Sequence, residues 1–335
     1  MRPRIGILLL GTTPMSIRIY VEKIRARLPE HGLESVVFDD PRALPDADLY
    51  WDPRTGGGRA PTPALAETSR PLVATLHDVA HLSLPWREFY PDWRAAASGW
   101  FDSLAVRRDW RRYQRRLARV VVPSQVTRDE ARRFLGLDDD LFSVIPHGVD
   151  QALFSRPAEA PASPEAPYFL HISQYQPRKN VGRLLAAHQS LPAAGRPRLV
   201  MKLIGYGGPR GQAGVEYLDG ILPGETIAAL YRHALAFVFP SVNEGFGLPV
   251  LEAMASGCPV ITSRATACAE VAGDAALLVD PYDPADLARA LTAVAEDPAL
   301  RADLARRGRE RLGAFDWNES ADAHARVFLQ VLDGR

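Results

Sequence analysis

Short apolar runs recur along the whole chain and alternate with longer stretches of mixed polarity. Strands of a parallel sheet are covered by helices on both faces, so they appear as near-continuous apolar runs. A regular succession of such runs and amphipathic segments predicts an α/β protein with doubly wound parallel sheets. The runs that we interpret as strands are residues 5–10, 49–51, 71–76, 120–122, 142–150, 168–173, 199–204, 234–239 and 259–262.

The chain is long enough for two domains. Its 335 residues exceed the roughly 250 to 300 over which a single hydrophobic core usually extends. Residues 157–167 are rich in Pro, Ala and Glu and lack periodicity, which predicts an interdomain linker. We therefore expect one Rossmann-like domain at residues 1–156 and a second at 168–313, with a C-terminal helix at 314–335.

The segment after the strand at 234–239 has the features of a loop followed by a short helix. Pro249 suits the first helical position and Gly257 suits the left-handed residue after the last turn. Gly245 and Gly247 leave the preceding loop without side chains, so a ligand could approach the backbone closely. The N–H groups of the first helical turn would attract an anion such as a phosphate.

Two glutamates flank this loop. Glu244 lies in the loop and Glu252 in the helix, with seven residues between them. Because Glu244 precedes the helix, the pair need not follow helical spacing, and both carboxylates could border one cavity. Carboxylates form charge-assisted hydrogen bonds with hydroxyl groups, which suggests a ligand that combines a sugar with a diphosphate.

A second strand-to-helix turn carries two cations. Arg178 and Lys179 follow the strand at 168–173 and precede a helix that we expect to begin near Val181. Their charges add to the positive end of that helix, so the turn is a second candidate for anion binding.

Other candidates in the first half allow two interpretations. His77 follows the strand at 71–76, where a side chain points either into a ligand crevice or toward hydrogen-bonding backbone groups. Asp46 and Asp48 form an Asp-x-Asp pair that could bind a divalent ion, although a solvated surface position is favoured. Gly56, Gly57 and Gly58 predict a flexible loop at the carboxyl edge of the sheet.

An arginine-rich segment follows, and we expect a helix over residues 107–119. A basic helix face could lie against an anionic membrane or a phosphorylated acceptor, but Asp102 and Asp109 dilute the charge and favour a solvated helix. The basic positions are Arg107, Arg108, Arg111, Arg112, Arg115, Arg116 and Arg119.

Composition narrows the functional classes. The chain is 47% hydrophobic and 24% charged, with zero formal net charge, so nothing in its overall charge attracts nucleic acid. The two cysteines show neither a metal-ligand spacing nor a disulfide framework, which predicts a cytoplasmic protein. The run at 5–10 is too short for a membrane span or a signal peptide.

The stretch from Glu244 to Glu252 resembles the glutamate-x7-glutamate signature of the retaining glycosyltransferases of family 4. This resemblance implies the GT-B fold, in which two Rossmann-like domains face a central cleft and a C-terminal helix crosses back to the first domain. It extends over the whole chain and is strongest in residues 168–282. By this resemblance Glu252 would hold the ribose and Glu244 the donor sugar. The backbone of four loop residues would lie near sugar and phosphate: Gly245, Phe246, Gly247 and Leu248.

The resemblance assigns roles to further residues. Arg178 and Lys179 match the Pro-Arg-Lys-Asn turn that binds the donor diphosphate, although Ser173 replaces the usual glycine at its start. His77 would lie near the reacting sugar. In the loop after the first strand only Gly11 matches the family's glycine-rich pattern, which weakens a phosphate role there. The segment that contains Gly220 and Ile221 would line the base pocket.

The resemblance thus implies a retaining, metal-independent glycosyltransferase without a cofactor. Its donor would be a nucleotide-diphosphate-sugar, with GDP-mannose suggested by similarity to bacterial mannosyltransferases of surface polysaccharides. The acceptor would be a glycan, a lipid-linked sugar or a small molecule, and the enzyme would work in the cytoplasm or at the inner face of the plasma membrane. A GT-B nucleotide-sugar epimerase and a non-catalytic nucleotide-sugar-binding module are the alternatives.

Overall fold

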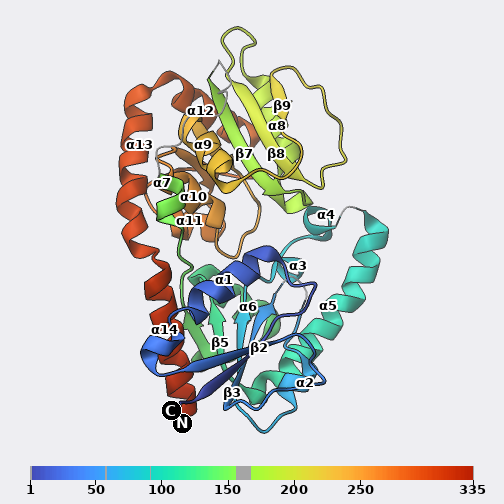
Figure 1. Ribbon diagram of the computed structural model, residues 1–335. Helices are drawn as coiled ribbons and strands as arrows, with labels where there is room; N and C mark the ends of the chain where they lie inside the picture. The colour runs from blue at the N-terminus through green and yellow to red at the C-terminus, as the bar shows by residue number, and fades with distance from the viewer. Residues whose placement is uncertain (1, 57–58, 91, 156–166, 335) are drawn as a thin grey trace. The chain divides into compact units, whose positions relative to one another are not determined.

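The computed structural model describes residues 2–56, 59–90, 92–155 and 167–334 (Figure 1). These residues form two compact units. Unit 1 comprises residues 1–86, 92–148 and 315–335, and unit 2 comprises residues 87–91 and 149–314. Gly57, Gly58 and the predicted linker, except for Pro167, lie outside the described residues.

Unit 1 contains a parallel sheet of six strands in the order β2-β1-β3-β4-β5-β6. This order belongs to the doubly wound folds, and the strand order reverses between the first and third strands. The strands are β1 Arg4–Leu8, β2 Glu34–Phe38, β3 Leu49–Thr55, β4 Leu72–Leu76, β5 Leu117–Val122 and β6 Phe142–Val144. The helices are α1 Met15–Arg25, η1 Leu28–His31, α2 Pro63–Ala66, α3 Ala80–Ser83, α5 Trp93–Tyr113, η2 Gln114–Arg116, α6 Gln125–Leu135, η3 Asp139–Leu141 and α14 Trp317–Leu332, with α4 Trp86–Phe89 at the unit boundary.

Unit 2 contains a second parallel six-stranded sheet, in the order β12-β11-β10-β7-β8-β9. This is the order of the Rossmann fold, with the reversal between β7 and β10. Its strands are β7 Tyr168–Gln174, β8 Arg198–Ile204, β9 Val215–Tyr217, β10 Ala236–Phe239, β11 Val260–Ser263 and β12 Leu277–Val279. Its helices are α7 Gln151–Ser155, η4 Pro177–Lys179, α8 Val181–Ser190, α9 Gly224–His233, α10 Leu248–Ala255, α11 Ala267–Ala272, α12 Pro284–Glu296, α13 Pro298–Arg311 and η5 Leu312–Ala314.

The predicted α/β class and the pair of parallel, Rossmann-like sheets are confirmed. The apolar runs form strands because both faces of each sheet are covered; every residue of β3, β4, β10 and β11 is buried. Within the described residues, no helix is long and apolar enough to cross a bilayer.

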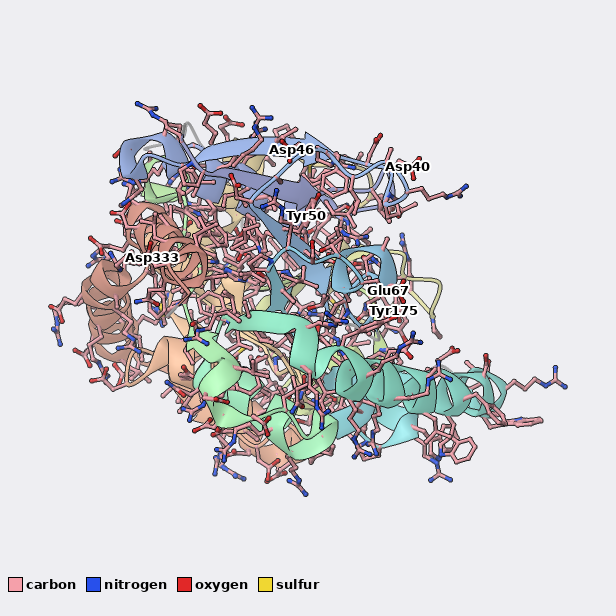
Figure 2. All side chains as sticks on the ribbon, turned by 90° about the horizontal axis from the view of Figure 1, so that it is seen from below. Asp40, Asp46, Tyr50, Glu67, Tyr175 and Asp333 are labelled. Carbon is pink, nitrogen blue, oxygen red and sulfur yellow. The ribbon has the colours of Figure 1, made fainter. Side chains whose placement is uncertain are left out.

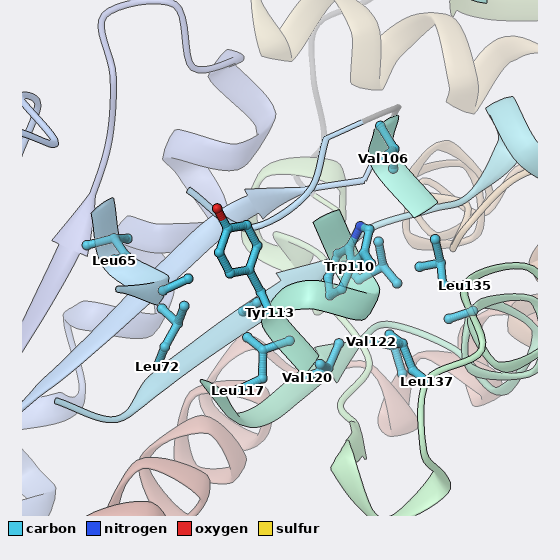
Figure 3. Packing of buried hydrophobic residues seen from close by; sticks show 14 of the residues in the cluster. Leu65, Leu72, Val106, Trp110, Tyr113, Leu117, Val120, Val122, Leu135 and Leu137 are labelled. Atoms are coloured by element: carbon cyan, nitrogen blue, oxygen red, sulfur yellow. The ribbon is translucent and has the colours of Figure 1, made fainter. Parts of the chain in front are cut away.

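The arginine-rich helix is shorter than predicted. Helix α5 ends at Tyr113, the short helix η2 follows, and Leu117 begins β5, so Arg119 lies on a strand. The chain leaves the helix because Leu117, Val120 and Val122 are needed in the core between β4 and β6, where Figure 3 shows them beside Trp110 and Tyr113 of α5. The basic face predicted over 107–119 therefore does not exist as one helical surface.

The C-terminal helix belongs to unit 1, as the predicted fold requires. The buried face of α14 contributes Ala321, Ala325 and Phe328 to the core that also contains Tyr20 and Ile24 of α1. Asp322 of α14 accepts hydrogen bonds from Arg27 at 2.9 Å and from His31 at 2.8 Å. The helix thereby covers one face of the first sheet.

The Asp-x-Asp pair lies on the surface of unit 1. The Asp46 side chain is exposed (Figure 2), and Arg70 lies 3.8 Å from Asp46 and 3.8 Å from Asp48. The backbone N–H of Arg4 also donates to Asp48, at 2.9 Å. These contacts agree with the solvated interpretation of the pair.

Candidate functional site

The two motifs that the sequence singled out in the second half meet at one point of the sheet of unit 2. The cationic turn follows β7 and the glutamate loop follows β10, and these strands are neighbours. The order in which the strands are laid down reverses between them, and in open α/β sheets such a switch point forms a crevice for ligands beyond the carboxyl ends of the strands. Topology alone therefore brings Arg178, Lys179 and Glu244 together.

Asn180 closes the cationic turn. It has a left-handed backbone with φ of 62°, a conformation that Asn tolerates better than most residues. Its side-chain Nδ2 donates to the carbonyl of Pro240 at 2.9 Å and to that of Pro281 at 2.6 Å. The turn is thus tied to the ends of β10 and β12, and α8 begins at Val181 as predicted.

The central feature is an ionic triad formed by Arg178, Lys179 and Glu244. Lys179 Nζ lies 2.6 Å from Glu244 Oε1, and Arg178 Nη1 lies 2.9 Å from Glu244 Oε2. Arg178 Nη1 also donates to the carbonyl of Asn243 at 2.9 Å, and its Nε donates to Gln176 at 2.7 Å. Two cations therefore share one carboxylate, which leaves a formal charge of +1 on the triad.

Burial and pairing act in opposite directions on the ionisation of the triad. Burial would raise the pKa of Glu244, but the guanidinium of Arg178 and the ammonium of Lys179 outweigh it and bring the pKa to about 2. Burial lowers the pKa of Lys179, and the attraction of Glu244 offsets part of that shift. The carboxylate is therefore ionised at neutral pH.

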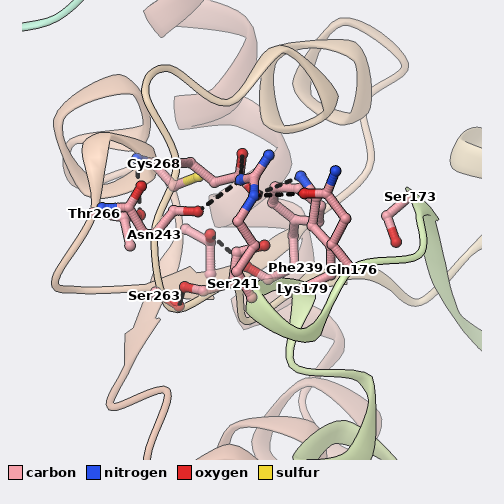
Figure 4. Close-up of polar contacts among 12 residues, drawn as sticks. Ser173, Gln176, Lys179, Phe239, Ser241, Asn243, Ser263, Thr266 and Cys268 are labelled. Carbon is pink, nitrogen blue, oxygen red and sulfur yellow. Dashed lines mark hydrogen bonds and ion pairs between the residues drawn. The ribbon is translucent and has the colours of Figure 1, made fainter. Parts of the chain in front are cut away.

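The triad rests on a buried layer that sequence reasoning did not find; Figure 4 shows Lys179, Phe239 and Ser173. Lys179 Nζ lies 5.0 Å from the ring centroid of Phe239, and that ring stacks on His171 at 5.9 Å. His171 Nδ1 lies 2.8 Å from the carbonyl of Val238, which can only accept, so Nε2 accepts from the hydroxyl of Ser173 at 2.9 Å. Burial lowers the pKa of His171 to about 4, which keeps the ring neutral beneath the cation.

The glycine loop is packed tightly against α11. Gly247 has φ of 115°, and a Cβ at this position would lie 2.9 Å from the Sγ of Cys268, so neither the backbone conformation nor the space suits a side chain. Phe246 is buried beside it, and Leu248 begins α10 with Pro249 in its first turn. Gly257 has φ of 71° after the helix, which confirms its predicted role.

Glu252 takes a different partner from Glu244. Its Oε2 accepts a hydrogen bond from the hydroxyl of Tyr231 on α9 at 3.2 Å. Burial raises the pKa of Glu252 to about 7, and the Tyr231 hydroxyl lowers it only in part. The two glutamates of the motif are thus distinct in charge: Glu244 is held as an anion, whereas Glu252 titrates near neutral pH.

The predicted base-pocket residues lie on an exposed loop after β9. Ile221 is fully exposed, and Gly220 has a left-handed backbone with φ of 72°. The carbonyl of Gly220 accepts from Lys202 Nζ, which also donates to the carbonyl of Leu218 at 3.2 Å. Lys202 is buried on β8, so it anchors this loop to the sheet from below, and nothing in the sequence pattern indicated that role.

His77 and Gly11 belong to unit 1. His77 Nε2 lies 2.7 Å from the carbonyl of Pro53, which can only accept, so the neutral ring carries its proton on Nε2. Burial lowers the pKa of His77. Gly11 is exposed at the end of the loop after β1, and Arg18 donates to the carbonyl of its neighbour Leu10 at 2.6 Å. The donor-binding roles predicted for these two residues stay predictions.

His77 is part of a histidine cluster that sequence reasoning also missed. Its ring lies 5.7 Å from His147 and 5.6 Å from Tyr20. The Tyr20 hydroxyl is 2.5 Å from His324 Nε2, and His324 Nδ1 is 2.7 Å from the carbonyl of Ser320. Burial lowers the pKa of His147 well below its usual value and that of His324 to about 4.

Two family models match successive parts of the chain. The model for glycosyl transferases group 1 matches residues 156–311, and the model for glycosyltransferase family 4 matches residues 54–153. The first of these ranges contains the triad and the glutamate motif. Both models describe glycosyltransferases, and they agree with the predicted resemblance to family 4.

Relatives and solved structures agree with this resemblance. The chain is 39% identical over 162 residues to O-antigen chain mannosyltransferase B of Escherichia coli, an alignment with 45% of this chain and 42% of that protein. It is 29% identical over 292 residues to the MMP alpha-(1->4)-mannosyltransferase of Mycolicibacterium hassiacum, with 80% of this chain and 67% of that protein. The chain thus spans less than half of the first of these relatives. Sucrose-phosphate synthase from Thermosynechococcus elongatus has the same GT-B fold, with a TM-score of 0.78, 20% identity and complete coverage of both chains.

Proposed function

We propose that this protein is a retaining glycosyltransferase that moves a sugar from a nucleotide-diphosphate-sugar to an acceptor hydroxyl. The bond between the anomeric carbon and the diphosphate oxygen breaks, and a bond from the acceptor oxygen to that carbon forms on the same face. The proton of the acceptor hydroxyl passes to the departing phosphate oxygen. Negative charge therefore develops on the diphosphate as the reaction proceeds.

The observation that carries this proposal is the net positive charge of the triad at the switch point of unit 2. Lys179 and Arg178 are fixed by Glu244 and by the turn that Asn180 closes, so they need not reorganise when a diphosphate arrives. A preorganised cation beside a developing negative charge stabilises the transition state more than the ground state. Glu244 acts here as the residue that positions both cations, and its predicted contact with sugar hydroxyls is an additional role.

Other residues complete the donor site in this proposal. Glu252 binds the ribose hydroxyls, and the backbone of the glycine loop lies along the sugar and phosphate. Two relatives are named mannosyltransferases, so GDP-mannose is the first donor to test. UDP-glucose is the second, because HepE from Anabaena has been solved with it, at a TM-score of 0.74 and 18% identity. The acceptor is a glycan, a lipid-linked sugar or a small-molecule hydroxyl in the cytoplasm.

A donor panel separates transfer from the two alternatives. Purified full-length protein is incubated with each nucleotide sugar, with and without candidate acceptors, and free nucleotide and sugar products are measured. A transferase releases nucleotide faster when an acceptor is present and forms a retained glycosidic linkage. An epimerase converts the donor without needing an acceptor, and a binding module releases nothing, so either result would replace the proposed function.

Replacing Lys179 tests the role of the triad directly. We expect Lys179→Met to lower kcat about 100-fold to 1,000-fold, the usual loss when a preorganised charge that stabilises a transition state is removed. The control is Lys23→Met on α1, outside the triad, which should leave the rate unchanged. Thermal melting of both variants shows whether they fold. Full activity of a folded Lys179→Met variant would contradict the assignment.

A further inference from the structure

Helix α5 presents a group of large apolar side chains to solvent. Trp93 is 65% exposed, Trp100 59%, Phe101 67% and Leu104 47%. Singly exposed apolar residues are ordinary, but a contiguous apolar patch on a soluble protein usually marks an interaction surface. All four residues lie within the first twelve residues of α5, the helix that Figure 1 labels.

Helical geometry places these side chains on one face. Trp100, Phe101 and Leu104 follow Trp93 by seven, eight and eleven positions, which is the spacing of a single stripe along an α-helix. The buried residues of α5 are Gly99, Val106, Trp110 and Tyr113, and they follow a different stripe that packs on the sheet (Figure 3). The helix therefore has two apolar faces, and only one of them is used by the fold.

Positive charge continues the exposed stripe toward the C-terminal end of α5. Arg108 and Arg111 follow Leu104 by four and seven positions, so they extend the same face. Asp102 and Asp109 fall on another side of the helix. Arg108 is paired with Asp109 at 2.9 Å, but the pair is exposed and such pairs are weak.

We infer that this face of α5 docks on the surface of a bilayer that contains anionic lipid. Trp and Phe side chains prefer the boundary between headgroups and acyl chains, where an amphipathic helix lies in the plane of the membrane. Arginine guanidinium groups bind lipid phosphates, and each basic residue near an anionic surface adds to the attraction. The order along the helix, aromatic and then basic, supplies both contributions on one surface.

Vesicle flotation of the full-length protein tests this inference. We expect binding to vesicles of phosphatidylcholine with phosphatidylglycerol, and little binding to phosphatidylcholine alone. The variant Trp100→Ala/Phe101→Ala should bind about tenfold more weakly, because binding scales with the apolar area buried. The variant Arg108→Glu/Arg111→Glu should lose the preference for anionic lipid.

The matched controls replace residues on other helices. Met15→Ala changes an exposed apolar residue on α1, and Arg326→Glu changes an exposed arginine on α14; both variants should bind like the wild type.

Three results would overturn the inference. The first is failure of the wild type to bind anionic vesicles, and the second is equal binding by the α5 variants. The third is concentration-dependent self-association, measured by sedimentation, that the same substitutions abolish, because α5 would then bind a second copy of the chain. Thermal melting verifies the fold of each variant. Vesicle binding needs neither donor nor acceptor, so its failure would leave the proposed transfer reaction untouched.

Discussion

Both units bury an ion pair near the carboxyl edge of their sheet, but the two pairs are built differently. In unit 1, Arg54 and Asp52 lie on the same strand, 3.1 Å apart, and the hydroxyl of Thr62 donates to Asp52 at 2.7 Å. This pair is electrically neutral. In unit 2, Glu244 is shared by Arg178 and Lys179, which come from a different loop, and one positive charge remains.

The difference indicates which edge is suited to an anion. A buried charge is tolerated when it is paired and hydrogen-bonded. In unit 1 the charges of Arg54 and Asp52 cancel. Unit 1 also holds the neutral rings of His77, His147 and His324, whose pKa values are lowered by burial. Unit 2 instead keeps a cation in excess, a charge that a diphosphate could balance.

Replacing the shared carboxylate should have the largest effect. Glu244→Gln removes the carboxylate that Arg178 and Lys179 share, and we expect a loss of about 3–5 kcal/mol in the free energy of unfolding. Added inorganic pyrophosphate should restore part of that stability, because an anion that binds only the folded state stabilises it. Urea unfolding with and without pyrophosphate measures both quantities.

The matched variant in unit 1 is Asp52→Asn. It also leaves a buried cation unpaired and should destabilise the protein, by about 3 kcal/mol. Pyrophosphate should not rescue it, because Arg54 is one cation within a strand rather than part of a cationic turn. Rescue of both variants to the same extent would mean that the two edges do not differ in anion binding.

The two units should also respond to acid at different pH values. The pKa of His324 is about 4 in the folded chain against an ordinary 6.5, so the unfolded chain binds more protons between these values. The stability of unit 1 is therefore complete above pH 6.5 and falls by roughly 3 kcal/mol as the pH drops to 4. The pKa of Glu244 is about 2 against 4.5, so the contribution of the triad is complete above pH 4.5 and is lost toward pH 2.

Fluorescence can separate these two responses, because all six tryptophans belong to unit 1. We expect tryptophan emission to change at a higher pH than the far-ultraviolet circular dichroism of the whole chain. In His324→Gln the tryptophan transition should move to lower pH, whereas in the control His233→Gln on α9 it should stay in place. A single transition seen by both probes, unchanged in His324→Gln, would contradict the comparison.

The sequence predicted the parts of the site that depend on local pattern. Nine of the strands in the described residues followed from short apolar runs, the start of α8 from the turn before Val181, and the limits of α10 from Pro249 and Gly257. The short strands β2, β9 and β12 were missed, and the run at 142–150 forms a strand only over Phe142–Val144. The end of α5 was predicted wrongly because arginines favour a helix locally, whereas Leu117 is drawn into the sheet by its partners there.

Partnerships over long separations could not be predicted. Nothing in the local pattern shows that Glu244 binds cations 65 and 66 positions away, although the order of the strands brings them together. The histidine cluster gathers residues from four separate segments, and each histidine alone looks like an ordinary strand end or helix position. For Asn180 the sequence indicates only the local conformation, because an Asn that ends a turn suits a left-handed backbone.

The smallest effect that we predict concerns Glu252, the titrating member of the glutamate pair. Burial places its pKa at about 7, and an ionised carboxylate accepts stronger hydrogen bonds from ribose hydroxyls than a protonated one. The affinity for GDP should therefore rise a few-fold between about pH 6 and about pH 8, as Glu252 loses its proton. Isothermal calorimetry measures this change.

Because the phosphate of GDP also titrates in this range, the wild type is compared with Glu252→Gln, in which only the phosphate contribution remains. Equal pH dependence in both proteins would show that Glu252 does not bind the ribose as an anion. The difference in ionisation between Glu244 and Glu252 would then have no role in donor binding.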